Sequence, residues 1–252
     1  IAPDDARAKR PPTVSDLRSK TFAGWPKRVG KLQLVKVSDI ERDGVRLAAY
    51  DFDSQPGIRL RMHFVHKTDL AKGAPVHLQV LNDNQVEDIA SQLKFVAKHP
   101  GVYVSLSPRG IGPTRLSQNQ KHLTQTRRRF MLLGQTLAGQ QVWDVRRGIR
   151  ALRTLERCTD APLELWGTGD SASLITLASL FEKKISRLNI SGYPTTDREQ
   201  PDFLNISRFV TTTQLLDIAK HKTEVRAFDQ AANFPGKKSA WHNFDRYDFK
   251  LG

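Results

Sequence analysis

One short segment, residues 163–174, has the residue order from which nucleophilic chemistry can be built. Four residues typical of a strand (LELW) precede two glycines, Gly167 and Gly169, and an apolar helical pattern follows at once. A strand that turns sharply into a helix can present a serine hydroxyl at its bend, in the pattern G-x-S-x-G. The central position of this bend is Gly169, which has no side chain. The segment therefore predicts the geometry of a nucleophile site without the attacking oxygen.

The nearest hydroxyl on the helix side of the bend belongs to Ser171. A serine there can satisfy a free backbone N–H at the start of the helix, and the position favours this interpretation. Alternatively it is a nucleophile, which needs a base and a third group to orient the base. The chain offers Asp229, which follows an apolar strand, and His242 for those two roles. The backbone N–H of Asp170 and a backbone donor near Asn82 would then bind the oxyanion.

The same bend also fits the dinucleotide-binding pattern G-x-G-x-x-G/A, with Gly167, Gly169 and Ala172 in the three positions. In that pattern the glycines let a pyrophosphate approach the backbone at a helix N-terminus. Here the motif comes late in the chain, the strand at 188–190 is not followed by an acidic residue, and Asp170 would repel phosphate. A nucleotide site is therefore a minor alternative.

The elements that must position this bend alternate along the chain. Short turns join the first three strands, which predicts antiparallel pairing, and the later strand–helix alternation predicts parallel pairing with helices on both faces. The fold class is thus α/β, a three-layer sandwich around a mostly parallel sheet with antiparallel N-terminal strands. Strands are expected at 31–37, 45–52, 58–66, 75–81, 102–106, 163–166, 187–191 and 224–228, and helices at 85–99, 141–157, 171–181 and 213–219.

This order of elements resembles that of the α/β hydrolases. The segment VYVSLSPRGIGPT (102–114), with its R-G-x-G loop, is similar to the acetyl-xylan-esterase-like group of secreted esterases, as are FMLLGQT (130–136) and VWDVRR (142–147). The resemblance covers residues 31–230 and implies an exported protein that deacetylates carbohydrate without a cofactor. It places the family's nucleophile at Gly169 and its acid at Asp229. Arg109, in the R-G-x-G loop, is expected to brace neighbouring loops.

Because position 169 has no hydroxyl, the sequence leads to two alternative expectations about function. The first is a catalytically degenerate α/β-hydrolase-like domain, serving as a scaffold, binding or accessory domain of a larger esterase. The second is an active carboxylic-ester hydrolase that uses Ser171, Asp229 and His242 as displaced residues. Residues 1–30 are expected to form an outer arm or a linker to an upstream domain, and 31–252 the hydrolase-like domain. Acylated carbohydrate or polysaccharide is the expected ligand.

The net charge of +14 at pH 7 would attract anions. Aromatic residues are not interleaved with the arginines, so nucleic acid is not an expected partner. Asp144 is expected to open or brace its helix. The histidine spacing and the single cysteine predict no metal site, and no apolar run is long enough to span a membrane. The basic residues are spread along the chain, and their one tight cluster is at 127–129. Arg146, Arg150, Arg153 and Arg157 share one face of an expected helix, which is predicted to be a solvated, charged face.

Overall fold

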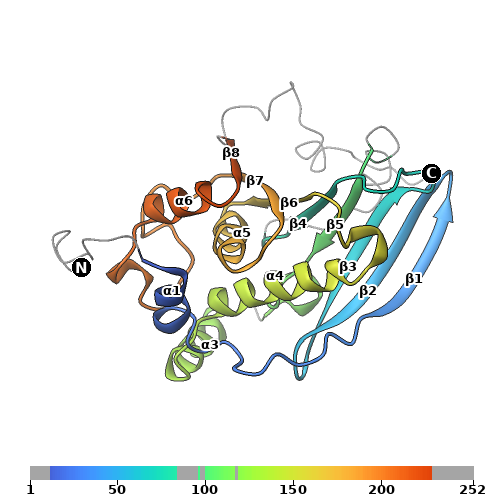
Figure 1. Cartoon of the computed structure of the whole chain (residues 1–252). Coiled ribbons are helices and arrows are strands. Elements are labelled where there is room, and N and C mark those ends of the chain that lie inside the picture. Colours follow the sequence, from blue (N-terminus) through green and yellow to red (C-terminus); the bar gives the residue numbers. More distant parts are fainter. Residues whose placement is uncertain (1–11, 84–95, 97–99, 117–118, 229–252) are drawn as a thin grey trace.

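The computed structural model describes residues 12–83, 96, 100–116 and 119–228. These residues form an eight-stranded sheet with the order β1-β2-β3-β5-β4-β6-β7-β8 (Figure 1). The pairs β1–β2, β2–β3 and β3–β5 are antiparallel. The pairs β5–β4, β4–β6, β6–β7 and β7–β8 are parallel. The predicted fold class is therefore confirmed. The strands are β1 (Val35–Arg42), β2 (Val45–Gln55), β3 (Ile58–Lys67), β4 (Val76–Val80), β5 (Val102–Leu106), β6 (Leu163–Thr168), β7 (Ile185–Ser191) and β8 (Glu224–Phe228).

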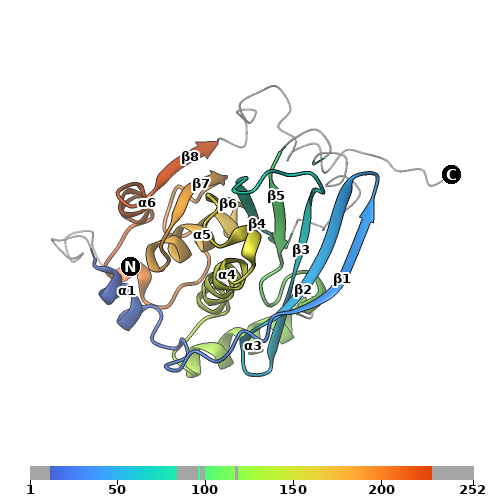
Figure 2. The same cartoon turned by 45° about the vertical axis from the view of Figure 1, so that its right-hand side comes forward.

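Helices α4 (Leu137–Arg153) and α5 (Asp170–Phe181) pack on one face of the sheet, and α6 (Thr212–Lys220) lies beside α5 (Figures 1 and 2). Nearly every residue of α5 is buried, as expected for a helix that is apolar on all sides. Helix α3 (Gln120–Leu132) has no buried residue. The opposite face of the sheet carries a small buried cluster that includes Val96 and Tyr103. Apart from Val96, the helix expected at 85–99 lies outside the described residues.

Several element boundaries differ from the sequence prediction, and helix α3 was not predicted. Two of the boundary differences have clear local reasons. Strand β1 is shifted to Val35–Arg42 because it pairs with β2 up to a two-residue turn, Asp43-Gly44. Both turn residues have positive φ, which matches the twist of a hairpin. Helix α4 starts at Leu137 rather than 141, because the Thr136 hydroxyl accepts a hydrogen bond from the Gly139 N–H at 3.0 Å. Asp144 therefore lies inside α4, and the expectation that it opens the helix is wrong.

Part of the N-terminal segment lies in the core, so the expectation that it packs on the outside is wrong for the stretch 17–25, whereas residues 27–30 are exposed. Leu17 of α1 (Val14–Lys20) is completely buried, and Phe22 and Trp25 are nearly so. The Phe22 and Trp25 rings stack with their centroids 4.2 Å apart, and Phe22 meets Phe181 of α5 edge-on. The large apolar side chains of this segment fill the space beside α4 and α5, although the segment is polar and proline-containing in composition.

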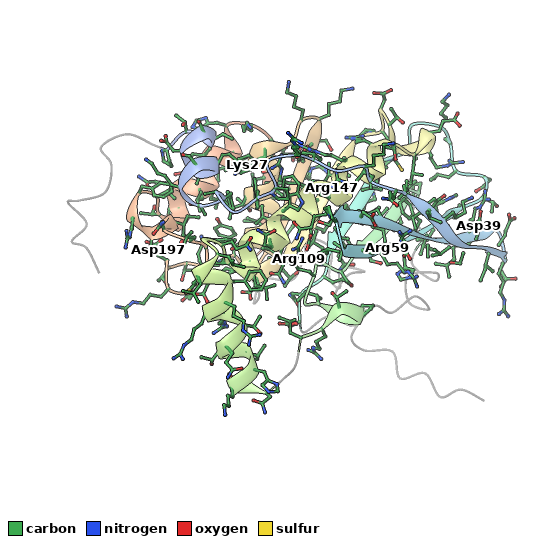
Figure 3. The ribbon with its side chains drawn as sticks, turned by 90° about the horizontal axis from the view of Figure 1, so that it is seen from below. Lys27, Asp39, Arg59, Arg109, Arg147 and Asp197 are labelled. Carbon is green, nitrogen blue, oxygen red and sulfur yellow. The ribbon has the colours of Figure 1, made fainter. Side chains whose placement is uncertain are left out.

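The predicted solvated face is wrong for Arg146, which is buried, as is its neighbour Arg147. Of the other predicted members, Arg157 is exposed and Arg150 and Arg153 are half-buried. Arg146 is 8% exposed and Arg147 is 3% exposed. The Arg146 guanidinium binds Glu182 at 2.7 Å and lies 4.7 Å from the centre of the Trp25 ring. Arg147 donates to the backbone carbonyls of Gly30 and Asp53, both at 2.9 Å, and Figure 3 shows it within the body of the molecule. Burial lowers the pKa of both arginines, and their hydrogen bonds tie separate segments onto α4.

Candidate functional site

The candidate site lies where the connections of the sheet change direction. From β4 the chain continues to β5 on one side, whereas from β6 it continues to β7 on the other side. In open α/β sheets, ligands bind outside the carboxyl ends of the strands at such a switch point. Asn82 follows β4 and Gly169 follows β6. The topology therefore brings these two predicted site residues together from positions far apart in the sequence.

The bend between β6 and α5 has the sharp geometry that its glycines predict. Gly169 is the N-cap of α5, with φ +58° and ψ −124°, a conformation that residues with a side chain rarely adopt. The positive φ explains why this position of the bend holds a glycine. Gly167 is needed for a different reason, because a Cβ there would lie 2.7 Å from backbone atoms of Ser171. The two glycines allow the strand to turn directly into the helix.

The Ser171 hydroxyl is engaged with the backbone at the end of the strand. Its Oγ accepts a hydrogen bond from the Thr168 N–H at 2.8 Å and donates one to the Thr168 carbonyl at 3.0 Å. The residue is completely buried. Within the described part of the chain, no histidine or carboxylate is hydrogen-bonded to this oxygen. The Ser171 hydroxyl therefore holds the bend together, and within the described residues no base is placed to activate it.

Asn82 and Asp170 flank the bend on opposite sides. The Asn82 side-chain amide donates to the Thr168 carbonyl at 2.7 Å, which is the same carbonyl that Ser171 binds. A Cβ built on Gly169 would meet only the Asn82 Nδ2 within 4 Å, at 3.9 Å. The position of the absent side chain is thus open, and Asn82 lies next to it. Asp170 is the first residue of α5, where its backbone N–H has no partner within the helix.

A hollow of about 160 Å³ opens at the bend and is acidic in character. Asp170 lines it together with Asp83 from the β4 end and Asp202 from the loop before α6, and Arg127 of α3 lies on its rim. Arg127 is 3.9 Å from Asp202, at the limit of an ion pair. Partial burial and then repulsion from Asp83 and Asp202 raise the pKa of Asp170. Three carboxylates around one small hollow oppose a phosphate, although the protein as a whole is basic. Sequence reasoning did not single out Asp83 or Asp202, and it treated Arg127 only as part of the basic cluster at 127–129, because nothing in the local pattern places the three residues together.

The raised pKa of Asp170 predicts a pH-dependent effect of Asp170→Asn. The folded state holds this proton more tightly than the unfolded chain does, so stability falls as the pH rises from the ordinary aspartate pKa of about 4 through the raised value. Because asparagine does not titrate, the variant does not lose this stability as the pH rises. We therefore expect it to gain stability relative to the wild type between about pH 4 and pH 7, and none near pH 3. Urea unfolding at several pH values measures the difference. A gain independent of pH would contradict the assignment, and Asp160→Asn, at an exposed carboxylate paired with Lys184, is the control.

Arg109 lies in a buried network beneath the loop that follows β5. Its guanidinium binds Asp144 of α4 through two nitrogens, at 2.6 and 2.8 Å, and its backbone N–H binds the same carboxylate at 2.9 Å. The Ser54 hydroxyl of β2 also donates to Asp144, which is completely inaccessible to solvent. Figure 3 labels Arg109 between α4 and the strands. The network joins the R-G-x-G loop to α4 and β2, and its charged groups do not line the hollow at the bend.

The structure thus brings together Gly167, Gly169, Asp170, Ser171 and Asn82. Asp229 and His242 lie outside the described residues, so their relation to the bend stays a prediction. Groups of three or more histidine, cysteine, aspartate or glutamate side chains able to hold a metal ion do not occur in the described part of the chain. No described helix is long and apolar enough to cross a bilayer.

No protein-family model matches the sequence, and no curated protein matches it. Solved structures do resemble the fold. A candidate acetyl xylan esterase from Bacteroides fragilis superposes with a TM-score of 0.67 at 10% identity, over 85% of this chain and 65% of that one. A glucuronoyl esterase from Solibacter usitatus gives 0.61 at 12% identity, over 91% and 76%. Acetyl xylan esterase 1 from a Thermoanaerobacterium species gives 0.52 at 11% identity, over 71% and 56%.

These likenesses define the class of protein to which the fold belongs. The chain has the α/β-hydrolase fold in the form found in esterases of this kind, as the sequence resemblance predicted. It spans about two thirds of the Bacteroides fragilis protein. At 10–12% identity the likeness concerns the fold, so activity and substrate have to be argued from the residues of this chain.

Proposed function

We propose that this protein is a non-catalytic α/β-hydrolase domain, which serves as a binding or accessory domain for an esterase acting on acylated carbohydrate. The observation that carries the proposal is at the bend. The nucleophile position is Gly169, and the nearest hydroxyl, Ser171, is bound to both backbone groups of Thr168. Acyl transfer to an enzyme needs a side-chain nucleophile beside a base, and the described site supplies neither.

The choice of ligand is supported by the shape and polarity of the bend and by the fold. The structures that resemble this chain carry the names acetyl xylan esterase and glucuronoyl esterase, both of which act on substituted carbohydrate. The hollow at the bend is smaller than the roughly 300–1,000 Å³ of most ligand pockets, and it has room for an acyl substituent rather than a whole sugar. The N-terminus of α5 presents the backbone N–H of Asp170, a donor suited to an ester carbonyl oxygen.

Two assays on the whole chain test the proposal directly. We expect no turnover of 4-nitrophenyl acetate above that of the Ser171→Ala variant, and no labelling by a fluorophosphonate that reacts with activated serines. Ser171→Ala removes two backbone contacts and should lower stability by about 1–3 kcal/mol, so circular dichroism must show that it is folded. Turnover or labelling that disappears in folded Ser171→Ala would overturn the proposal and establish an active hydrolase with a displaced nucleophile.

The Gly169→Ser variant tests whether the site lacks only the nucleophile hydroxyl or lacks the base and the acid as well. The added Cβ has room, since its nearest neighbour is 3.9 Å away, but the positive φ costs about 1–3 kcal/mol for a residue with a side chain. We expect a folded variant without ester turnover, because the acidic hollow and the described contacts hold no base against this position. Gly169→Ala is the matched control for strain. Turnover at least tenfold above Gly169→Ala would show that a base and an acid still converge on the bend.

A further inference from the structure

A second hollow, of about 430 Å³, lies at the opposite end of the parallel strands from the bend. Val102, the first residue of β5, and Cys158, which precedes β6, form part of its base, whereas Gly169 follows the last residue of β6. Residues of β1, β2 and β3 line it on one side, and Leu155 and Glu156, which follow the end of α4, line it on another. The volume falls within the range of about 300–1,000 Å³ typical of ligand sites.

The floor of this hollow is apolar and partly aromatic. Ala48 and Phe64 are buried within the face of β2 and β3, and Leu155 closes the side where α4 ends. Tyr50 is half-buried beside Phe64, with the two ring centroids 5.0 Å apart and the rings nearly perpendicular. An aromatic ring that is held in this way presents a rigid apolar surface with a hydroxyl at its edge.

The rim of the hollow is cationic. Four cationic side chains line it, namely Lys36, Arg46, Lys72 and Arg157, together with His66. Glu156 is the one acidic side chain among the described lining residues. Asp39, just outside, binds both Lys36 and Arg46 at 2.6–2.7 Å and offsets part of their charge. No described carboxylate pairs with Lys72 or Arg157. Arg157 donates to the Leu70 carbonyl at 3.0 Å, which holds the turn that carries Lys72 against the end of α4.

His66 adds a group suited to a neutral polar ligand atom. Its Nδ1 is 2.7 Å from the Lys67 carbonyl, so this nitrogen carries the proton and donates, and Nε2 is left as an acceptor. Burial, together with nearby Arg157 and Arg46, lowers the pKa of His66 and keeps the ring neutral at pH 7. A ligand hydroxyl could therefore donate to it.

We propose that this hollow binds an acidic saccharide, a sugar ring that carries a carboxylate or a sulfate. The apolar face of the ring would lie against Tyr50, a hydroxyl would donate to His66, and the anionic group would face Lys72 and Arg157. The anionic character is inferred from the hollow alone, whereas the choice of a saccharide rests on the proposed function. A nucleic acid fits less well, because strand-tracking sites use a series of stacking aromatics, whereas the half-exposed rings among the described lining residues are those of Tyr50 and His66.

Calorimetry on the whole chain tests the site with charge-matched ligands. Trigalacturonic acid and a sulfated disaccharide are the two anionic probes, the methyl ester of trigalacturonic acid is the neutral counterpart, and a short single-stranded oligonucleotide is the rival. We expect at least one anionic sugar to bind, the neutral ester to bind at least tenfold more weakly, and the affinity to fall with added salt. Whichever anionic sugar binds identifies the anionic group. Tighter binding of the oligonucleotide than of either sugar would overturn the proposal.

Substitutions in the lining test whether the sugar binds in this hollow. Substitutions of basic residues elsewhere show how much of the affinity is general attraction to a basic protein. Lys72→Gln with Arg157→Gln should weaken the affinity about tenfold, since each exposed charge contributes up to about fivefold, and Tyr50→Ala should weaken it as well. Lys72→Gln alone, at a side chain with no described contact, covers the case in which the double variant does not fold. Lys27→Gln and Arg198→Gln remove the same charge at exposed positions outside both hollows and should change nothing. An equal loss of affinity in the lining variants and in the control variants would overturn the proposed site.

Failure of the proposed function would show instead in the ester assay, which uses a neutral substrate and depends on Ser171.

Discussion

Replacing Asp144 by alanine should cost about 3–5 kcal/mol of unfolding free energy, which is the largest single effect we expect in this protein. The carboxylate is completely buried and binds the Arg109 guanidinium through two nitrogens, the Arg109 N–H and the Ser54 hydroxyl. Its removal leaves a buried cation and a buried N–H without an acceptor. Breaking a buried pair costs far more than the pair contributes, because an uncompensated charge stays in the interior. Urea denaturation measures the loss.

Two further variants establish that the loss comes from the stranded charge. Asp144→Leu combined with Arg109→Met removes both charges, so we expect it to be more stable than Asp144→Ala. Asp160→Ala breaks the ion pair with Lys184, in which both side chains are at least 72% exposed, and should cost less than about 1 kcal/mol. A loss below about 1 kcal/mol for Asp144→Ala would show that the Arg109 network does not hold the loop against α4.

The second large effect concerns the N-terminal segment. Phe22→Ala should lower the unfolding free energy by about 3–5 kcal/mol, the usual cost of removing a fully buried aromatic side chain. Phe22 is 1% exposed and contacts the rings of Trp25, Phe181 and Phe203. The cavity would therefore open between the segment after α1, helix α5 and the loop before α6. Thermal or urea unfolding of the whole chain provides the measurement.

A matched substitution in the same segment provides the control. Val29 lies only a few residues later but is 50% exposed, so Val29→Ala should change stability by less than about 0.5 kcal/mol. If Phe22→Ala is as mild as Val29→Ala, then the segment is a loosely attached arm, as its composition suggested. A large difference between the two variants would establish that residues 12–25 fold together with the rest of the domain.

Local patterns account for the parts of the structure that the sequence predicted well. Apolar alternation and turn residues located most of the strands, and the pair Gly167 and Gly169 predicted a sharp bend that begins α5. These features depend on neighbouring residues, since backbone sterics and side-chain periodicity act over a few positions. The start of α4 was missed although Thr136 is a standard cap, because the cap lies four residues before the apolar periodicity that we followed.

The buried charges and the acidic hollow could not be predicted in the same way. Arg146 has the spacing of a solvated face, yet Arg146 and its neighbour Arg147 lie in the interior because Glu182 and backbone carbonyls from distant segments meet them there. Whether such a group is buried depends on whether a partner can offset its lost hydration. That partner is defined by contacts between residues far apart in the chain.

The sequence by itself determined that the bend would exist and that its central residue would carry no oxygen, because both follow from the identity and spacing of a few adjacent residues. Only the tertiary structure decided what surrounds that bend. The order of strands placed Asn82 beside Gly169, the packing of α5 turned Ser171 onto Thr168, and the loops gathered Asp83 and Asp202 around Asp170. The physical reason is that backbone conformation is set by local sterics, whereas burial, charge and access depend on segments brought together by the fold.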